Sequence, residues 1–269
     1  MTFDRAAYLK RIGQEGAEPQ ADATGLAALQ QAQMRALTFE NIDPLLGRVP
    51  DLSPEALWEK LILGGRGGYC FELNGLFARV LQDFGFTVRP ILARVRMGAP
   101  TGGPRSHQAF IVSIGPDDYL SDTGFGGPAP AGPLPIRHDM EQEVAGVTFR
   151  IRRDHDTGEE VLERRSADGW FSLYGFDRAP VAPPDYLAAN FVAARWDRSQ
   201  FPTTLMMTRM TQGGRVSLRN RALRIIDGPE AQERRIDDAD DLMALLRGPF
   251  QLRLSDEQLA AVWGKIAET

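Results

Sequence analysis

The spacing of hydrophobic residues changes at about residue 87, and this change limits the possible folds more than any other feature of the chain. Before it, apolar residues recur three and four positions apart, which predicts amphipathic helices. After it, short runs of alternating apolar and polar residues predict strands, and from about residue 186 the two patterns mix. We therefore expect an α+β fold with three regions: a helical one over 1–86, a strand-rich one over 87–185 and an α/β one over 186–269.

The helical region contains recognisable start and stop signals. Ser53 followed by Pro54 predicts a helix start, because a serine side chain can cap a free backbone N–H and proline fits the first turn. Gly85 predicts the end of a longer helix that begins near Cys70. Its apolar residues follow helical spacing: Leu73, Leu76, Phe77, Val80, Leu81 and Phe84. Cys70 is therefore expected in the first turn of this helix.

The other two regions contain two predicted hairpins. In the first, HQAFIVSI and DYLSD flank the turn sequence GPDD, and a strand with alternating Ile91, Ala93, Val95 and Met97 precedes it. The glycine- and proline-rich stretch GFGGPAPAGPLPIR predicts a loop held over another part of the molecule. Further on, GRVSLRNRALRII predicts the second hairpin, and a Ser255–Gln258 capping box predicts a final helix.

Composition argues against several classes of protein. The 31 basic and 36 acidic residues give a net charge of −5 without a basic block, so we expect no nucleic-acid partner. The charged amino terminus and the lack of a long apolar run predict neither export nor membrane insertion. A single cysteine and three histidines make no thiolate-rich metal site, and we expect no bound metal and a reducing cytoplasmic location. The oligomeric state stays open.

The single cysteine, Cys70, is the first candidate for chemistry. The positive end of a helix dipole and unpaired backbone N–H groups favour the thiolate form of a cysteine in a first helical turn. Glycines at positions 64, 65, 67 and 68 leave backbone exposed, so a substrate is expected to approach closely there. The alternative is a structural cysteine, since free cysteines are among the most buried residues.

His107 and Asp122 lie on the two strands of the first predicted hairpin. If its loop has an even number of residues, paired residue numbers sum to an odd value and these two side chains project from one face. Only the tighter registers bring them within diagonal reach, and the sequence does not fix the register. An imidazole can take a thiol proton while a carboxylate fixes its tautomer. A structural histidine and a solvated carboxylate are the alternative; His138 and His155 are expected to be solvated.

Five segments, in this order and at these separations, resemble the arylamine N-acetyltransferase family: RALTFENIDPLLG, RGGYCFELNGLF, HQAFIV, YLSDTGFGGP and GRVSLRN. The resemblance covers nearly the whole chain. It implies an N-terminal helical bundle, a central β-barrel and a C-terminal α/β lid, with a triad arranged as in papain-type cysteine proteases and transglutaminases. It also implies Cys70 as nucleophile, with His107 and Asp122 as the other members of the triad.

The resemblance implies a two-step reaction that belongs to xenobiotic metabolism. Cys70 takes an acetyl group from the cosubstrate acetyl-CoA, and the nitrogen of an arylamine, arylhydroxylamine or hydrazine then attacks the thioester. No cofactor is bound permanently. The resemblance implies that Phe125, Phe39, Gly124 and Gly126 line the substrate pocket, although both phenylalanines have a core role as the alternative.

The sequence departs from the family pattern at two places. NFVAARWDRSQF replaces a segment that contacts the coenzyme in many members, with only Asn190, Ser199 and Phe201 retained, and Ser121 and Thr123 replace residues that are commonly apolar. Other functions stay open: a hydrolase or transglutaminase with the same triad, an amide synthase that closes macrolactams, or a binding module without catalysis. We expect Arg66 to pair with a carboxylate and hold the glycine turn.

Overall fold

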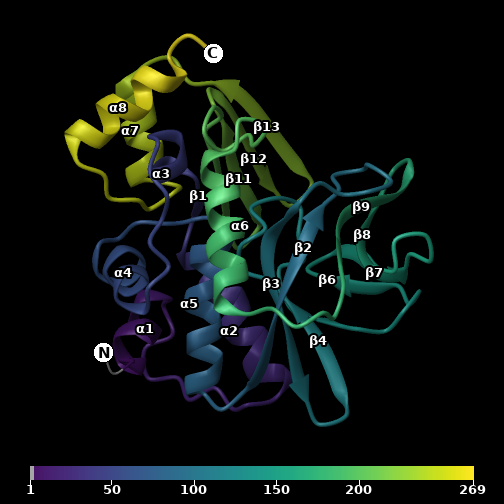
Figure 1. Ribbon diagram of the computed structural model, residues 1–269. Coiled ribbons are helices and arrows are strands. Elements are labelled where there is room, and N and C mark those ends of the chain that lie inside the picture. The colour runs from purple at the N-terminus through teal and green to yellow at the C-terminus, as the bar shows by residue number, and fades with distance from the viewer. Residues whose placement is uncertain (1–2) are drawn as a thin grey trace.

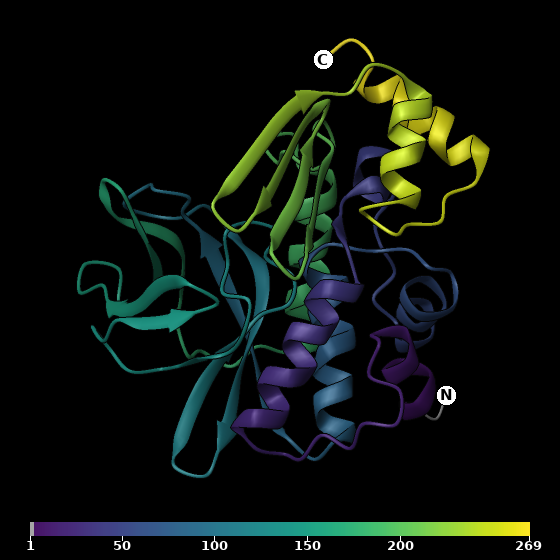
Figure 2. The same ribbon diagram turned by 180° about the vertical axis from the view of Figure 1, so that it is seen from behind.

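The computed structural model describes residues 3–269, which form a helical part, a strongly curved sheet and a C-terminal part (Figure 1). The helical part contains α1 Arg5–Arg11, α2 Ala23–Ala36, α3 Ile42–Leu45, α4 Pro54–Trp58, the π-helical segment η1 Glu59–Leu63 and α5 Cys70–Asp83. Helices α2 and α5 lie side by side in both views and pack against the sheet (Figures 1 and 2).

The start of each of these helices has a local cause. The Ser53 side chain accepts a hydrogen bond from the Ala56 N–H at the start of α4, with Pro54 in the first turn, as predicted. Aspartates cap α1 and α2 in the same way, and such a cap contributes about 1 kcal/mol to helix stability. Helix α5 begins at Cys70 and is followed by Gly85 at φ +89°, so both predicted ends are confirmed.

The curved sheet is antiparallel, with strand order β5-β4-β3-β2-β9-β8-β7-β6, and it forms a nearly closed barrel. Its strands are β2 Thr87–Val95, β3 Arg105–Ile114, β4 Asp117–Ser121, β5 Leu134–Pro135, β6 Gln142–Val144, β7 Val147–Arg153, β8 Glu160–Ser166 and β9 Gly169–Phe176. Side chains with alternating direction on β2 and β3 fill two different cores. Ile91, Ala109 and Ile111 lie inside the barrel, whereas Leu92 and Val112 pack against the helices.

The hairpin of β3 and β4 turns through only two residues, Gly115 and Pro116. Gly115 has φ +58°, which glycine adopts without the steric cost that a side chain would bring. The register pairs Phe110 with Ser121 and Ile114 with Asp117. Continued by one residue, it sets Asp122 opposite Ala109, two positions from His107 and therefore within diagonal reach on one face.

The C-terminal part combines a second antiparallel sheet with helices. Its strands are β10 Met206–Met210, β11 Gly214–Arg219, β12 Ala222–Asp227 and β13 Glu230–Arg235, and its helices are α6 Pro183–Arg195, α7 Ala239–Arg247 and α8 Asp256–Ile266. The strand order is β1-β10-β11-β12-β13, so the sheet is completed by β1 Phe39–Glu40 from the helical part. The predicted hairpin and the Ser255–Gln258 capping box are both confirmed.

Three local expectations differ from the structure. The predicted loop after Asp122 includes the short strand β5, and Met97 lies beyond the end of β2 with φ +46°. His138 is only partly exposed, and its Nε2 lies 2.8 Å from the Glu160 carboxylate, so its expected solvation was wrong. The division at residues 86 and 185 stays a prediction; α6 runs from 183 to 195, across the second boundary.

Candidate active site

Cys70 is the first residue of α5 and is 3% exposed. The residue before it, Tyr69, is the N-cap, and the Glu72 carboxylate accepts a hydrogen bond from the Tyr69 N–H at 3.1 Å. Because Cys70 opens the helix, its own N–H has no carbonyl one turn earlier to bind. The thiol therefore lies beside backbone donors at the positive end of a helix.

Two of the four glycines before Cys70, Gly67 and Gly68, pack against the protein and do not open the backbone to a substrate. Gly67 and Gly68 are buried, and Gly68 exchanges backbone hydrogen bonds with Thr38 and Glu40 beside β1. A Cβ atom at Gly67 would lie 2.1 Å from the Thr38 carbonyl oxygen. The expectation of close substrate approach is therefore wrong for these two glycines, whose role is to let two backbone segments touch.

A buried cluster of charges holds this turn and the start of α5. Arg66 pairs with Glu40 at 2.7 Å, which confirms the predicted carboxylate partner, and Lys60 lies 2.5 Å from both Asp43 and Glu72. Burial, together with the Glu40 charge, raises the pKa of Glu72 to about 7 although Lys60 opposes this shift. Sequence analysis missed Lys60 because η1, which positions it, has no clear sequence signal.

His107 and Asp122 are in direct contact. His107 Nε2 lies 2.7 Å from Asp122 Oδ2, and both side chains are almost fully buried. Burial lowers the pKa of His107, but the Asp122 carboxylate and a hydrogen bond with the Cys70 thiol raise it to about 10. Since Nε2 faces the carboxylate, Nδ1 is the ring nitrogen left for the thiol.

Asn74 fixes the carboxylate from the second turn of α5. Its Nδ2 donates to Asp122 Oδ1 at 2.9 Å and to the Gln108 carbonyl at 2.6 Å, and its Oδ1 accepts the Thr123 N–H. Burial raises the pKa of Asp122, but His107, Asn74 and the Gly124 N–H together lower it below its ordinary value. Sequence analysis missed Asn74, although its position four residues after Cys70 sets both residues on one side of the helix.

The two unusual polar residues beside Asp122 have polar partners on α2. Ser121 donates to Gln30 Oε1 at 2.8 Å, and Gln33 Nε2 donates to the Thr123 hydroxyl at 2.9 Å. These groups are buried, so a change on only one of the two segments would leave an unpaired polar atom. Ser121 and Thr123, which depart from the family pattern, therefore have matching polar partners on α2 in this chain.

Cys70 and His107 open onto a cavity of about 1500 Å³ in total, of which about 580 Å³ is accessible to the centre of a water-sized molecule. Phe125, Phe39, Gly124 and Gly126 also line it, so the predicted pocket residues all lie here, while Asp122 is behind His107. The Phe125 ring lies edge-on to His107, with the centroids 5.0 Å apart. Gly126 has φ +71°, and a Cβ there would lie 2.5 Å from the Phe39 ring.

One aromatic residue beside the triad was not predicted. Tyr174 on β9 is fully buried with its ring centroid 4.9 Å from that of His107, and burial raises its pKa well above the ordinary value. Trp196 and Arg198, which follow α6 in the altered segment, line the active-site cavity. Tyr174 is distant in sequence from every motif, and the pairing of β9 with β2, the neighbour of β3, brings it to the site.

Within residues 3–269 no cluster of histidine, cysteine and carboxylate side chains is arranged to hold a metal ion. No helix in the same part of the chain is long and apolar enough to cross a membrane.

The contacts between the His107 imidazole, the Cys70 thiol and the Asp122 carboxylate define a protein of the Cys-His-Asp class on an α+β fold. A family model described as N-acetyltransferase matches residues 22–259. The arylamine N-acetyltransferase / N-hydroxyarylamine O-acetyltransferase of Salmonella typhimurium is 36% identical over 234 residues, 86% of this chain and 83% of that protein. The chain belongs to the arylamine N-acetyltransferase family, as its motifs predicted.

Two further comparisons bear on the site. The structure of the Mycobacterium marinum arylamine N-acetyltransferase in complex with CoA matches with a TM-score of 0.89 at 31% identity, covering 97% of this chain and 99% of that one. The proansamycin X synthase of Amycolatopsis mediterranei is 30% identical over 251 residues, 91% of this chain and 95% of that protein. The fold is therefore shared with an arylamine N-acetyltransferase that binds CoA.

His107 should make stability depend on pH. Its pKa in the folded protein, about 10, lies above the unfolded value of about 6.5. The free energy that the raised pKa of His107 adds to the stability of the folded protein is therefore fully present below pH ~6.5. It is lost as the pH rises through about 10. In urea unfolding, His107→Gln should be less stable than the parent at pH ~6, and the difference should shrink towards pH ~10. His155→Gln, at an exposed position, is the control. If the difference in the free energy of unfolding between the parent and His107→Gln stays the same at all pH values, the prediction is wrong.

Proposed function

We propose that this chain transfers an acetyl group from acetyl-CoA, through a thioester on Cys70, to the nitrogen of an arylamine, arylhydroxylamine or hydrazine. The observation that carries the proposal is the contact of His107 with both Cys70 and Asp122 at the wall of a large cavity, in a chain of this family. A thiol and an imidazole in contact suit a covalent acyl intermediate, because the imidazole can take the thiol proton.

Because the pKa of His107 is about 10, its imidazole is protonated near neutral pH, and in the first half-reaction the Cys70 sulfur attacks the carbonyl carbon of acetyl-CoA with the proton already on His107. The backbone N–H groups at the start of α5 are the donors that we assign to the developing oxyanion. The carbon–sulfur bond to CoA then breaks, and the CoA sulfur takes the proton from the imidazolium. Asp122 holds the ring in position and stabilises its positive charge throughout.

In the second half-reaction the acceptor nitrogen attacks the acetyl-thioester carbon. His107 removes a proton from the nitrogen, and the Cys70 sulfur leaves and is reprotonated, which gives the acetylated product and the free thiol. Aromatic walls are suited to an aromatic acceptor, and we assign this role to Phe125 and Phe39. Gly124 and Gly126 then serve by letting the loop lie close to Cys70 and to the Phe39 ring.

The three regions would divide this work, with the nucleophile on 1–86, the base and carboxylate on 87–185 and a lid formed by 186–269. We also propose a reducing cytoplasmic location, because the mechanism needs Cys70, the only cysteine, as a free thiol. The net charge of −5 supports small molecules, and not nucleic acid, as partners.

Steady-state kinetics tests the proposed order of events. Because the acetyl group stays on Cys70 after CoA leaves, initial rates with acetyl-CoA and an aromatic amine should give parallel lines in double-reciprocal plots. CoA should also be released in the absence of any amine, in an amount equal to the enzyme. Intersecting lines without such a burst would indicate direct transfer in a ternary complex and would overturn the thioester mechanism.

Arg198 should contribute to the acetyl-CoA side of the cavity. It is an exposed residue that lines the cavity, and its guanidinium lies 5.8 Å from the centroid of the Trp196 ring, so a coenzyme phosphate can reach it. Arg198→Ala should raise the KM for acetyl-CoA about three- to tenfold, the effect of about 1 kcal/mol from one charge-assisted contact. The ranking of aromatic amines should not change. Arg247→Ala, on α7 and outside the cavity, is the matched control.

The match to proansamycin X synthase favours a second candidate, an amide synthase with a different acyl donor. The altered segment after Asn190 supports this candidate as well, because it lines the wall that we assign to the donor. Incubation with acetyl-CoA alone separates the two functions: the acetyltransferase forms a thioester at once, whereas a synthase for another donor stays unmodified.

A further inference from the structure

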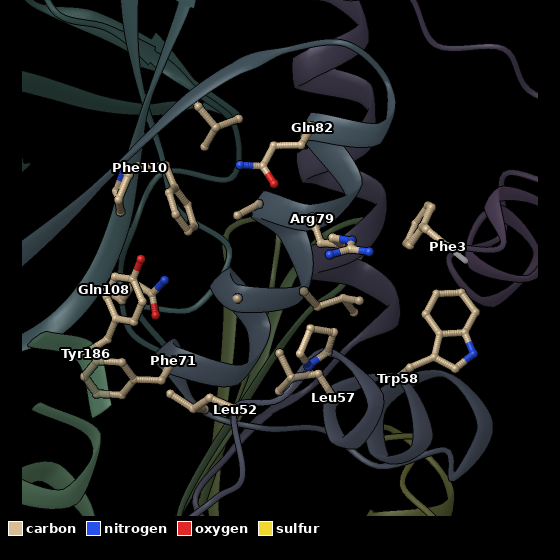
Figure 3. A pocket seen from close by; sticks show the side chains of 16 residues that line it. Phe3, Leu52, Leu57, Trp58, Phe71, Arg79, Gln82, Gln108, Phe110 and Tyr186 are labelled. Carbon is tan, nitrogen blue, oxygen red and sulfur yellow. The ribbon is translucent and has the colours of Figure 1, made fainter. Parts of the chain in front are cut away.

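A second cavity lies along α5, next to the helix face that carries Cys70 and separate from the active-site cavity. Figure 3 shows it, with Phe71 and Gln108 on one side and Leu57 and Trp58 on the other. Its volume is about 1030 Å³ in total, of which about 260 Å³ is accessible to the centre of a water-sized molecule, and none of its lining residues lines the active-site cavity. We call it the α5 groove.

The sequence of α5 explains why the groove exists. Four of its residues, at positions 71, 75, 78 and 82, follow the helical spacing i, i+4, i+7, i+11 and so share one face. Two of them are Gly75 and Ala78, whose small side chains leave space between the walls. Phe110 on β3 forms one wall and Trp58 on α4 the other (Figure 3). An aromatic ring that entered would therefore contact apolar surface on several sides.

Gln108 is the one feature of the groove that calls for a polar partner. It follows His107 on β3 and so points to the opposite face of the sheet, into the groove. The residue is only 5% exposed, yet within residues 3–269 no hydrogen bond joins its side-chain amide to another residue. In the described part of the chain the Gln108 amide atoms are not among the fully enclosed polar atoms that lack a partner, so they reach the space of the groove, where a group that enters can form a hydrogen bond with them.

The charges at the mouth of the groove do not select an ionic ligand. Arg79 is exposed there and forms no salt bridge in the part of the chain that the structure describes. The Glu55 carboxylate is close enough for the two charges to interact, since Arg79 contributes to the lowered pKa of Glu55. The apolar walls and the amides of Gln108 and Gln82 therefore determine what fits.

We propose that the α5 groove binds a neutral aromatic molecule of one or two rings whose hydroxyl or amide group pairs with Gln108. An apolar cavity of about 150 Å³ already holds benzene, so the α5 groove has room for a larger, two-ring molecule. This site is independent of the proposed function, because its ligand needs neither a reactive nitrogen nor Cys70.

The test uses 2-naphthol, and naphthalene as the matched ligand without a hydroxyl. Titration of the full chain into each fluorescent ligand should give a dissociation constant for 2-naphthol on the order of 0.1 mM. Naphthalene should bind about tenfold more weakly. Gln108→Leu preserves the size of the side chain and removes the amide, so it should reduce this preference to about twofold or less. Gln232→Leu, on the exposed strand β13, should keep it.

Two further measurements locate the ligand. Alkylation of Cys70 with iodoacetamide, which fills the active-site cavity near the thiol, should leave the affinity for 2-naphthol unchanged. Ala78→Phe should weaken binding at least tenfold by filling the groove, and circular dichroism checks that the variant folds. If Ala78→Phe does not fold, the preference of Gln108→Leu for 2-naphthol over naphthalene decides whether the proposal holds. Loss of binding after Cys70 alkylation, or an unchanged preference in Gln108→Leu, would overturn the proposal.

Discussion

Cys70→Ala should lose both the acetyl adduct and turnover. Intact mass spectrometry of the parent after mixing with acetyl-CoA and no amine should show one added acetyl group, located on Cys70 by peptide mapping. The chain has no other thiol, so nothing else can form a thioester with sulfur. Loss of the nucleophile should lower the rate with an aromatic amine by at least about 10⁴-fold, as expected when a covalent route is removed.

The variant also tests the alternatives. Alanine at this buried position removes one sulfur atom and should leave the fold intact, which a melting curve checks. If Cys70→Ala still acetylates an amine at the parental rate, the cysteine is structural. If the parent acquires no acetyl group but hydrolyses other thioesters, the chain is a hydrolase with the same triad.

Asp122→Asn should lower the rate of Cys70 acetylation by about 10³- to 10⁴-fold. An asparagine side chain fits the same space, but its amide can donate to His107 Nε2 and so favours the wrong tautomer. The ring then presents a protonated Nδ1 to the thiol and cannot act as its base. Loss of the carboxylate should also lower the pKa of His107, because the Asp122 charge and hydrogen bond raise it in the parent.

Rapid mixing with acetyl-CoA, followed by mass spectrometry at different times, measures this rate. Asp118→Asn is the control, because Asp118 lies on β4, four residues before Asp122, and pairs with Arg178 away from the triad. It should keep the parental rate. A near-parental rate in Asp122→Asn would mean that the carboxylate only terminates the strand, and the assigned role would be wrong.

Local features of the fold were predictable from the sequence because they depend on neighbouring residues. The caps at Ser53 and Ser255, the start of α5 and its end before Gly85 all follow from residues within one or two helical turns. The shared face of His107 and Asp122 also follows from a short loop with an even number of residues. The identity of the triad came from the family motifs, and the spacing alone left other possibilities open.

Features that depend on distant segments were not predictable. Gly67 is buried because Thr38, on a different segment, passes over it, and the two partners of Lys60 lie on two other elements, α3 and α5. Tyr174 reaches His107 only because β9 pairs with β2, the neighbour of β3. Each contact depends on how elements pack, and hydrophobic periodicity carries no information about that.

Strand β1 ties an early part of the chain to parts that are synthesised much later. Phe39 pairs with Thr208, and the Thr38 hydroxyl donates to the Phe250 carbonyl, 212 residues later. Asn41 donates to the Thr204 carbonyl and accepts from the Met206 N–H. During synthesis on the ribosome, these hydrogen-bonding groups of residues 38–41 therefore stay without their partners until the C-terminal sheet has been made. The turn that carries Arg66 and Gly68 is bound to the same strand by hydrogen bonds and an ion pair, so the nucleophile reaches its final setting only after the C-terminal sheet has been made.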